Sequence, residues 1–219
     1  MSSPPPTWVA GASGLIGRAL LTQLADRPVL ALVRRPMTDL PPGPHRREAV
    51  VDLLALPTGL PAPTQVLIAL GTTLAQAGSQ AAFRAVDLDA VLAVARAAQA
   101  AGATRCAVVS ALGADARSAM FYNRVKGEAE AALTALGFER LVIVRPSLLD
   151  GAREALGQPR RRAEAWTLRL TRPLAGLIPK TWRPIAPDRV ARAMVLALDQ
   201  PGPAVQVLES AAMQTLGAP

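Results

Sequence analysis

Short apolar runs alternate with longer stretches of helical spacing along most of the chain. Continuous apolar runs are typical of strands that are buried on both faces of a parallel sheet. Strands that alternate with helices through short connections predict βαβ units, and therefore an α/β fold. The predicted strands are 7–10, 29–33, 49–51, 66–70, 107–109, 141–144 and 205–208, and the predicted helices are 15–25, 81–101, 119–136 and 188–198.

The pattern changes after Pro146, where residues 147–187 are rich in Arg, Pro and Gly. Helical spacing is found there only near residues 163–174. No internal repeat and no long linker separates this segment from the rest of the chain. We therefore expect residues 1–219 to form a single domain.

Composition excludes several classes of protein. With 219 residues, of which 51% are hydrophobic, the chain is too apolar to be mainly disordered. The single cysteine, Cys106, excludes an intrachain disulfide framework, and its apolar neighbours predict a buried thiol. The only histidine, His45, lies in a loop of Pro, Gly and Arg, where we expect it to be exposed. No spacing of Cys, His, Asp or Glu indicates a metal site.

The sequence shows no secretion or membrane signal. Residues 1–6 lack a basic region followed by an apolar core. The longest stretch without charge, residues 53–83, contains three prolines, so it cannot form an uninterrupted helix across a membrane. We therefore expect a cytoplasmic protein with no membrane span.

The chain carries 24 basic and 16 acidic residues, and a net charge of +8 is typical of proteins that bind nucleic acid or another polyanion. The excess is concentrated in residues 151–183, where eight basic residues oppose two acidic ones. Arg160, Arg161 and Arg162 lie in this segment, but the aromatic residue near them is Trp166 alone and no DNA-reading motif is present. We therefore expect no nucleic acid, and favour a small-molecule substrate that carries an anionic group.

The strand at 7–10 runs directly into a glycine turn, Gly11-Ala12-Ser13-Gly14-Leu15-Ile16-Gly17. Gly11 can adopt the backbone angles of a sharp turn, Gly14 lets the backbone approach a pyrophosphate, and Gly17 lets the helix pack closely on the strand. Free N–H groups at the start of the helix would face the phosphates. The alternative is a βα turn without a ligand, but the position between the first strand and a helix favours a dinucleotide.

Two arginines, Arg34 and Arg35, follow the second strand. NAD-binding proteins usually carry Asp or Glu at this position, where it binds the ribose 2′-hydroxyl. Guanidinium groups suit a 2′-phosphate instead, because they can hold it bidentately. A solvated arginine pair is the alternative in an arginine-rich chain. The absence of any carboxylate before Asp39 favours NADP(H) over NAD(H).

Tyr122 and Lys126 are four residues apart in the predicted helix at 119–136, so they share one face. A lysine one turn from a tyrosine lowers the phenol pKa, and such a phenol can pass a proton to or from a substrate oxygen during hydride transfer. Ser110 ends the preceding strand, where its hydroxyl would hold the same oxygen. Tyr122 is the only tyrosine and Lys126 is one of two lysines, which favours a functional pair over a chance match.

The glycine turn, Ser110, Tyr122 and Lys126 together resemble a short-chain dehydrogenase/reductase of the atypical or extended branch. Further motifs are similar to the Tat-interacting-protein type of these enzymes, over about residues 7–210. These motifs are Ala69-Leu70-Gly71-Thr72-Thr73, Ala77-Gly78-Ser79, Val86-Asp87, Val109-Ser110-Ala111-Leu112-Gly113-Ala114-Asp115, Tyr122-x-x-x-Lys126-Gly127-Glu128-x-Glu130 and Arg145-Pro146-Ser147-Leu148-Leu149-x-Gly151.

The resemblance implies a Rossmann-type doubly wound parallel sheet with a small C-terminal substrate region, which we place at residues 147–187. It implies Tyr122 as the catalytic acid/base, Lys126 as the partner of the tyrosine and of a ribose, and Ser110 as the third catalytic residue. The gap between Ser110 and Tyr122 is shorter than in most extended members, which makes Ser118 a rival for the serine role.

The sequence therefore predicts an NADPH-dependent oxidoreductase that reduces a carbonyl or oxidises an alcohol, as a monomer or homodimer. The alternative is an NADP(H)-binding redox sensor or scaffold with little or no turnover. The resemblance further implies that Asp52 meets the adenine, and that Pro146 and Ser147 lie near the nicotinamide. The predicted cofactor site comprises Gly11, Ser13, Gly14, Leu15, Ile16, Gly17, Arg34, Arg35, Asp52, Leu53, Leu70, Gly71, Thr72, Tyr122, Lys126, Pro146 and Ser147.

Overall fold

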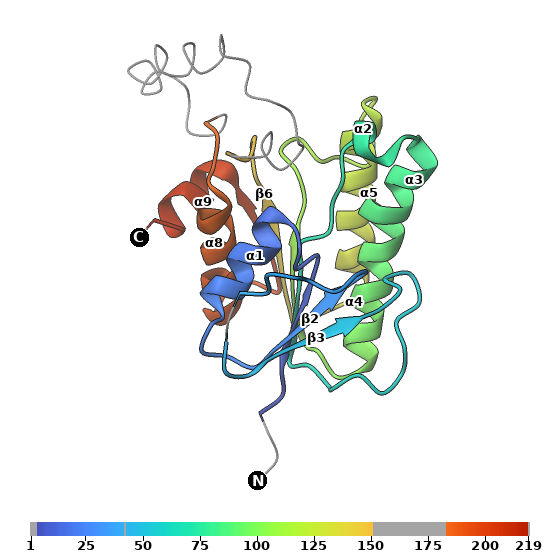
Figure 1. Cartoon of the computed structure of the whole chain (residues 1–219). Coiled ribbons are helices and arrows are strands. Elements are labelled where there is room, and N and C mark those ends of the chain that lie inside the picture. Colours follow the sequence, from blue (N-terminus) through green and yellow to red (C-terminus); the bar gives the residue numbers. More distant parts are fainter. Residues whose placement is uncertain (1–3, 42, 151–182, 219) are drawn as a thin grey trace, which may run out of the picture.

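Seven parallel strands form one sheet in the computed structural model, which describes residues 4–41, 43–150 and 183–218. The sheet runs through the centre of the molecule, with helices on both sides (Figure 1). Its strand order is β3-β2-β1-β4-β5-β6-β7. The strands are β1 (Thr7–Ala10), β2 (Val29–Val33), β3 (Arg46–Val50), β4 (Gln65–Ile68), β5 (Arg105–Val109), β6 (Arg140–Arg145) and β7 (Val205–Glu209).

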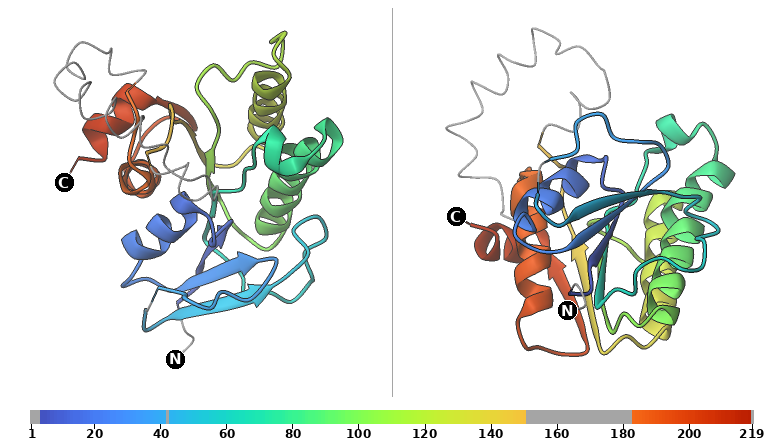
Figure 2. Two further views of the ribbon diagram at one scale, coloured as in Figure 1. Left: turned by 45° about the horizontal axis from the view of Figure 1, so that its top comes forward. Right: turned by 60° about the horizontal axis from the view of Figure 1, so that its bottom comes forward.

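Helices cover both faces of the sheet. The helices α1, α8 and α9 lie on one face, and α3, α4 and α5 lie on the other (Figures 1 and 2). The described helices are α1 (Leu15–Gln23), α2 (Leu74–Ala77), α3 (Gln80–Arg84), the π-helix η1 (Ala85–Ala90), α4 (Val91–Ala100), α5 (Phe121–Ala135), α8 (Pro187–Asp199) and α9 (Ser210–Leu216).

The two layers of helices give the sheet two separate cores. Successive side chains of a strand point to opposite faces, so Trp8 of β1 packs in the core under α3, α4 and α5, while Val9 packs in the core under α1 and α8. Leu30 and Ala31 of β2 divide in the same way. Burial on both faces explains why the central strands are continuous apolar runs in the sequence.

The strand order reverses between β1 and β4. The chain winds from β1 outward to β2 and β3, and then returns to the other side of β1 and winds outward to β7. Backbone pairing continues past β1 and β4, where the Ala69 amide donates to the Ala10 carbonyl oxygen at 2.8 Å. In open parallel sheets, ligands bind in the crevice at the carboxyl ends of the strands next to such a reversal. The predicted Rossmann-type doubly wound sheet is therefore confirmed.

The boundaries of several elements differ from the prediction. Strand β3 starts three residues earlier than the predicted 49–51, because the charged residues of this edge strand hide it from an apolar pattern. The predicted helix at 81–101 is helical up to Ala100, but it contains the π-helix η1. Helices α2 and α9 were not predicted, since both are short. The predicted helical segment at 163–174, the arginines at 160–162 and Trp166 lie outside the described residues, as does most of the predicted substrate segment at 147–187.

Two predictions about single residues are confirmed. His45 is exposed, and Cys106 is fully buried in the core, where burial raises the pKa of its thiol far above the ordinary value. Across 4–41, 43–150 and 183–218, no helix is long and apolar enough to cross a bilayer. Within the same ranges, no three side chains of His, Cys, Asp or Glu lie close enough together to hold a metal ion.

Candidate cofactor and catalytic site

The glycine turn between β1 and α1 contains two glycines that the chain itself requires. Gly11 has a φ of +79°, and a Cβ atom there would lie 2.5 Å from the Ala69 carbonyl oxygen. A Cβ atom on Gly17 would collide with the Gly11 carbonyl oxygen. Gly14 differs, because its φ of −78° suits any residue and its nearest neighbour would be the Gly11 carbonyl oxygen at 3.4 Å. The packing of the protein therefore leaves the space beside Gly14 for a group from outside the chain.

Helix α1 begins directly after Gly14, with Leu15 as its first residue and Ile16 buried behind it. No described side chain caps this end of the helix, and its first turn has no acidic residue. The exposed Ser13 and Gly14 precede the first turn. Uncapped N–H groups at a helix N-terminus attract phosphate, so the turn fits the pyrophosphate of a dinucleotide.

A cavity of about 380 Å³ lies beside the glycine turn and is rich in arginine. Arg34 and Arg35 are exposed at its wall, directly after β2. Neither guanidinium group has an ion-pair partner among the described residues. The cavity is lined by Ser13, Arg18, Arg34, Arg35, Pro36, Met37, Thr38 and Asp39.

Arg18 is the arginine of this cavity that the sequence did not single out. It comes from α1, and its Nη1 and Nη2 donate to the two carboxylate oxygens of Asp39 at 2.8 and 2.7 Å. This hydrogen-bonded pair lowers the pKa of the Asp39 carboxyl below its ordinary value. The signal in the sequence was its position four residues after Gly14, which places it on the same face of the helix as the start of the turn.

Three other predicted cofactor residues follow β3 and β4. Leu53 and Leu70 are buried, whereas Asp52 is exposed and its Oδ1 accepts a hydrogen bond from the Leu54 amide at 2.9 Å. This bond holds the turn after β3. The predicted residues thus lie after β1, β2, β3 and β4, all at the carboxyl ends of neighbouring strands.

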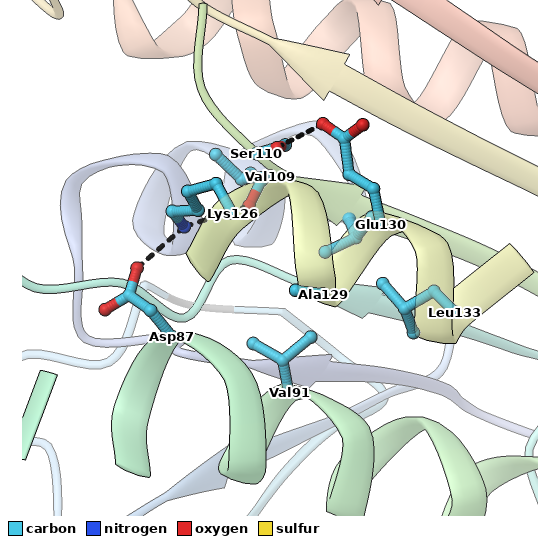
Figure 3. Close-up of a pocket in the computed structure, with 9 residues that line it drawn as sticks. Asp87, Val91, Val109, Ser110, Lys126, Ala129, Glu130 and Leu133 are labelled. Atoms are coloured by element: carbon cyan, nitrogen blue, oxygen red, sulfur yellow. Dashed lines mark hydrogen bonds and ion pairs between the residues drawn. The ribbon is translucent and has the colours of Figure 1, made fainter. Parts of the chain in front are cut away.

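Lys126 lies on α5 and is buried, with its ammonium group 2.7 Å from Oδ1 of Asp87 on η1 (Figure 3). The other oxygen of Asp87 accepts from the Thr72 amide at 2.9 Å. A Cβ atom on Gly71 would lie 3.8 Å from Lys126 Nζ. Asp87 therefore ties the predicted catalytic lysine to the loop after β4. The sequence singled out Lys126, Gly71 and Thr72, but it assigned no role to Asp87.

Tyr122 lies one turn before Lys126 on the same helix, and its ring packs 5.4 Å from the ring of Phe83. Its hydroxyl has no hydrogen-bond partner among the residues that the structure describes. Burial raises the pKa of the Tyr122 phenol above its ordinary value, and the Asp87 carboxylate acts in the same direction. The Lys126 ammonium lowers this pKa as expected, but burial has the larger effect.

Ser110 directly follows β5, but its hydroxyl donates to the carboxylate of Glu130 (Figure 3). Glu130 also pairs with Arg145, whose Nη2 lies 2.6 Å from Oε2, and this pairing raises the pKa of Arg145. The hydroxyl is therefore directed toward β6, away from the pair of Asp87 and Lys126. Glu130 stands in the motif that resembles the short-chain dehydrogenases/reductases, which was the available signal for it.

The remaining predicted residues lie near the end of β6. Pro146 is buried, and its carbonyl oxygen accepts from the Leu112 amide at 3.1 Å. The Ser147 hydroxyl donates to the Arg183 carbonyl oxygen. The rival serine, Ser118, accepts a hydrogen bond from the Met120 amide at 3.2 Å. Neither Ser118 nor Ser110 makes a hydrogen bond to Tyr122.

Comparisons with known proteins agree with this geometry. The model of a family described as NAD(P)H-binding matches residues 11–201. The chain therefore belongs to the NAD(P)H-binding family. Protein HTATIP2 of Rattus norvegicus is 32% identical over 222 residues, which cover 96% of this chain and 88% of the relative. This relative confirms the resemblance to the Tat-interacting-protein type.

Two further matches extend the comparison. Protein FMP52, mitochondrial, of Eremothecium gossypii is 42% identical over 153 residues, which cover 67% of each chain. A short-chain dehydrogenase/reductase superfamily protein from Agrobacterium tumefaciens with bound NAD superposes with a TM-score of 0.64 at 17% identity, over 93% of this chain and 77% of that one. This member of the NAD(P)H-binding family therefore has an oxidoreductase-like fold.

The prediction of a cytoplasmic protein is contradicted by the relatives. Four FMP52 proteins that are 34–42% identical to this chain are all named mitochondrial. The prediction rested on the lack of a secretion signal and of a membrane span. Neither feature bears on import into mitochondria, which uses amphipathic, arginine-rich segments.

We expect Gly14→Ala to change the free energy of unfolding by less than about 1 kcal/mol, because the chain leaves room for the added methyl group. The same variant should weaken NADPH binding about tenfold or more, because the methyl group would occupy space that a bound pyrophosphate needs. Gly17→Ala is the matched control. It should destabilise the protein by about 1–3 kcal/mol, because its methyl group collides with the turn. Urea denaturation and fluorescence titration with NADPH measure the two effects. Wild-type affinity in Gly14→Ala would contradict the assignment.

Proposed function

We propose that this member of the NAD(P)H-binding family is an NADPH-dependent oxidoreductase that reduces a carbonyl, or oxidises an alcohol, with Tyr122 as the acid/base. One observation carries the proposal. Lys126 on α5 pairs with Asp87, which accepts a hydrogen bond from Thr72 in the loop after β4. Ala69, at the start of this loop, lies against Gly11 of the glycine turn. This connection supports one continuous site for the proton donor and the dinucleotide.

The residues of the glycine turn and the arginine cavity fit a dinucleotide phosphate, since the space beside Gly14 suits a pyrophosphate and the guanidinium groups of Arg34 and Arg35 have no ion-pair partner in the described part of the chain. When bound, the cofactor supplies the hydride that adds to the carbonyl carbon. The Tyr122 hydroxyl donates its proton to the carbonyl oxygen, so that the alcohol forms and a tyrosinate remains. The Lys126 ammonium stabilises this tyrosinate, and Asp87 holds the ammonium in place.

The preference for NADP(H) rests on Arg34 and Arg35. We expect Arg34→Ala/Arg35→Ala to weaken NADPH binding about tenfold or more and to leave NADH binding within about twofold, because only NADPH carries a 2′-phosphate. Fluorescence titration measures both affinities. Arg96→Ala/Arg192→Ala is the control, since it removes two arginines from α4 and α8. Equal losses for NADPH and NADH would contradict the preference.

A second function is favoured by the hydrogen bonds of the site. The Ser110 hydroxyl is engaged by Glu130, and the Lys126 charge is balanced by Asp87. The first contact removes the serine hydroxyl from the substrate oxygen, and the second weakens the stabilisation of a Tyr122 tyrosinate by the ammonium group. Both support an NADP(H)-binding redox sensor or scaffold with little or no turnover. A screen of carbonyl substrates with the wild type and Tyr122→Phe separates the two functions. Turnover that the variant loses supports the enzyme, and tight NADPH binding without turnover supports the sensor.

The proposal extends to partners and organisation. We propose a small-molecule substrate with an anionic group, because the positive charge is concentrated in residues 151–183. We propose that the protein acts without nucleic acid, as a monomer or homodimer, and that residues 1–219 form one domain. The substrate-side role of residues 147–187 remains part of this proposal.

A further inference from the structure

Arg18 and Asp39 form the only described ion pair whose two residues both line the arginine cavity. The guanidinium group holds the carboxylate through two parallel hydrogen bonds of 2.8 and 2.7 Å. Its Nε also donates to the Ser13 carbonyl oxygen at 3.3 Å, which anchors the side chain to the glycine turn. The cavity thus contains one arginine that already holds an anion, beside Arg34 and Arg35, which hold none among the described residues.

The carboxylate of Asp39 occupies the position of an anionic ligand. Two parallel N–H donors of a guanidinium group bind a carboxylate and a phosphate with the same geometry. Both side chains of the pair are partly exposed, at 37% for Arg18 and 66% for Asp39. Exposed pairs of this kind are weak, so an incoming phosphate can displace the carboxylate at small cost.

The two cofactors place different groups in this cavity. A 2′-phosphate is a dianion that gains from three guanidinium groups and is repelled by a carboxylate. A ribose 2′-hydroxyl is a hydrogen-bond donor, and a carboxylate accepts from it. The same Asp39 side chain therefore opposes NADP(H) and favours NAD(H).

We propose that Asp39 is a specificity-determining residue, which holds Arg18 in the free protein and must release it before Arg18 can bind the 2′-phosphate of NADP(H). The inference rests on the proposed NADP(H) site. Asp39 thereby limits the preference for NADP(H) that Arg34 and Arg35 create. Arg18 becomes the third arginine of the 2′-phosphate site only when the carboxylate has moved away.

The test compares the full-length wild type with Asp39→Asn by fluorescence titration with NADPH and NADH, and by calorimetry with 2′,5′-ADP and 5′-AMP, which differ only by the 2′-phosphate. We expect Asp39→Asn to bind NADPH and 2′,5′-ADP about threefold more tightly or better, because one opposing charge is gone. Binding of NADH and 5′-AMP should stay unchanged or weaken. In an Arg18→Gln background, Asp39→Asn should tighten NADPH binding less than it does in the wild type, because the carboxylate then holds no guanidinium group that it could release.

Asp199→Asn is the matched control. It removes one negative charge and the pairs with Arg27 at 2.6 Å and Arg105 at 3.7 Å, which lie at the amino ends of β2 and β5. Unchanged NADPH affinity in Asp39→Asn, or equal tightening for NADPH and NADH, overturns the inference and leaves the proposed function standing. A wild type that binds neither cofactor overturns both. Melting temperatures of all variants verify that the comparison is made between folded proteins.

Discussion

Tyr122→Phe is expected to lose about 100-fold or more of the turnover of any carbonyl that the wild type reduces, because it removes the proton donor of the reaction. NADPH affinity should change by less than about threefold, since the ring and its packing against Phe83 are kept. Steady-state kinetics gives kcat, and fluorescence titration gives the affinity. A variant that retains wild-type kcat contradicts the acid/base role of Tyr122.

The pH dependence provides an independent check of the same role. The pKa of Tyr122 is raised above the ordinary value of about 10, mainly by burial. Reduction uses the protonated phenol, so its rate should stay constant through neutral pH and fall only as the pH rises through this raised pKa. Oxidation uses the tyrosinate and should accelerate with pH over the same range.

Ser110→Ala is the companion variant to Tyr122→Phe. A small effect on kcat is expected, because the Ser110 hydroxyl is bound to Glu130.

Asp87→Ala is expected to lower the free energy of unfolding by about 3–5 kcal/mol, because it leaves the buried ammonium group of Lys126 without its partner. The exposed fractions are 5% for the Lys126 side chain and 0% for that of Asp87, so water does not replace the lost contact. The Thr72 amide also loses its acceptor. Urea denaturation measures the change.

Glu128→Ala is the control for Asp87→Ala. Glu128 on α5 pairs with Arg84 on α3 at 2.7 Å, but both side chains are partly exposed, and we expect a loss below about 1 kcal/mol. The double variant Asp87→Leu/Lys126→Met should recover most of the stability, because it removes both buried charges and keeps their volume. A loss in Asp87→Ala no larger than that in Glu128→Ala contradicts the energetic role of the buried pair.

Much of the framework of the site was predictable from local sequence. Gly11 and Gly17 could be assigned because a turn from a parallel strand into a helix places strict demands on the backbone, whereas Gly14 could be assigned only from the spacing of the motif. The place of Arg34 and Arg35 beside the glycine turn could be predicted because the carboxyl end of the second strand has a fixed place in such a sheet. Tyr122 and Lys126 could be paired because four residues make about one helical turn.

The partners of these residues were not predictable, because they meet only through the tertiary fold. Asp87 and Lys126 come from different helices, and a carboxylate on an Ala-rich helix gives no local sign that it is buried. Arg18 and Asp39 join α1 to the loop after β2. Glu130 looks like one more exposed charge of α5 until β6 brings Arg145 beside it. Periodicity gives the face of a helix, but it does not give the neighbour of that face.

The π-helix η1 makes the candidate site depend on chain length as well as on residue identity. Asp87 lies within η1, and Val91 begins the regular helix that follows. A π turn takes up about one residue more than an α turn, and each helical residue adds a rotation of about 100°. Loss of one residue between Asp87 and Val91 would turn the carboxylate away from Lys126 while α4 kept its packing. Insertions or deletions here would thus separate the two charges even in chains that retain both residues.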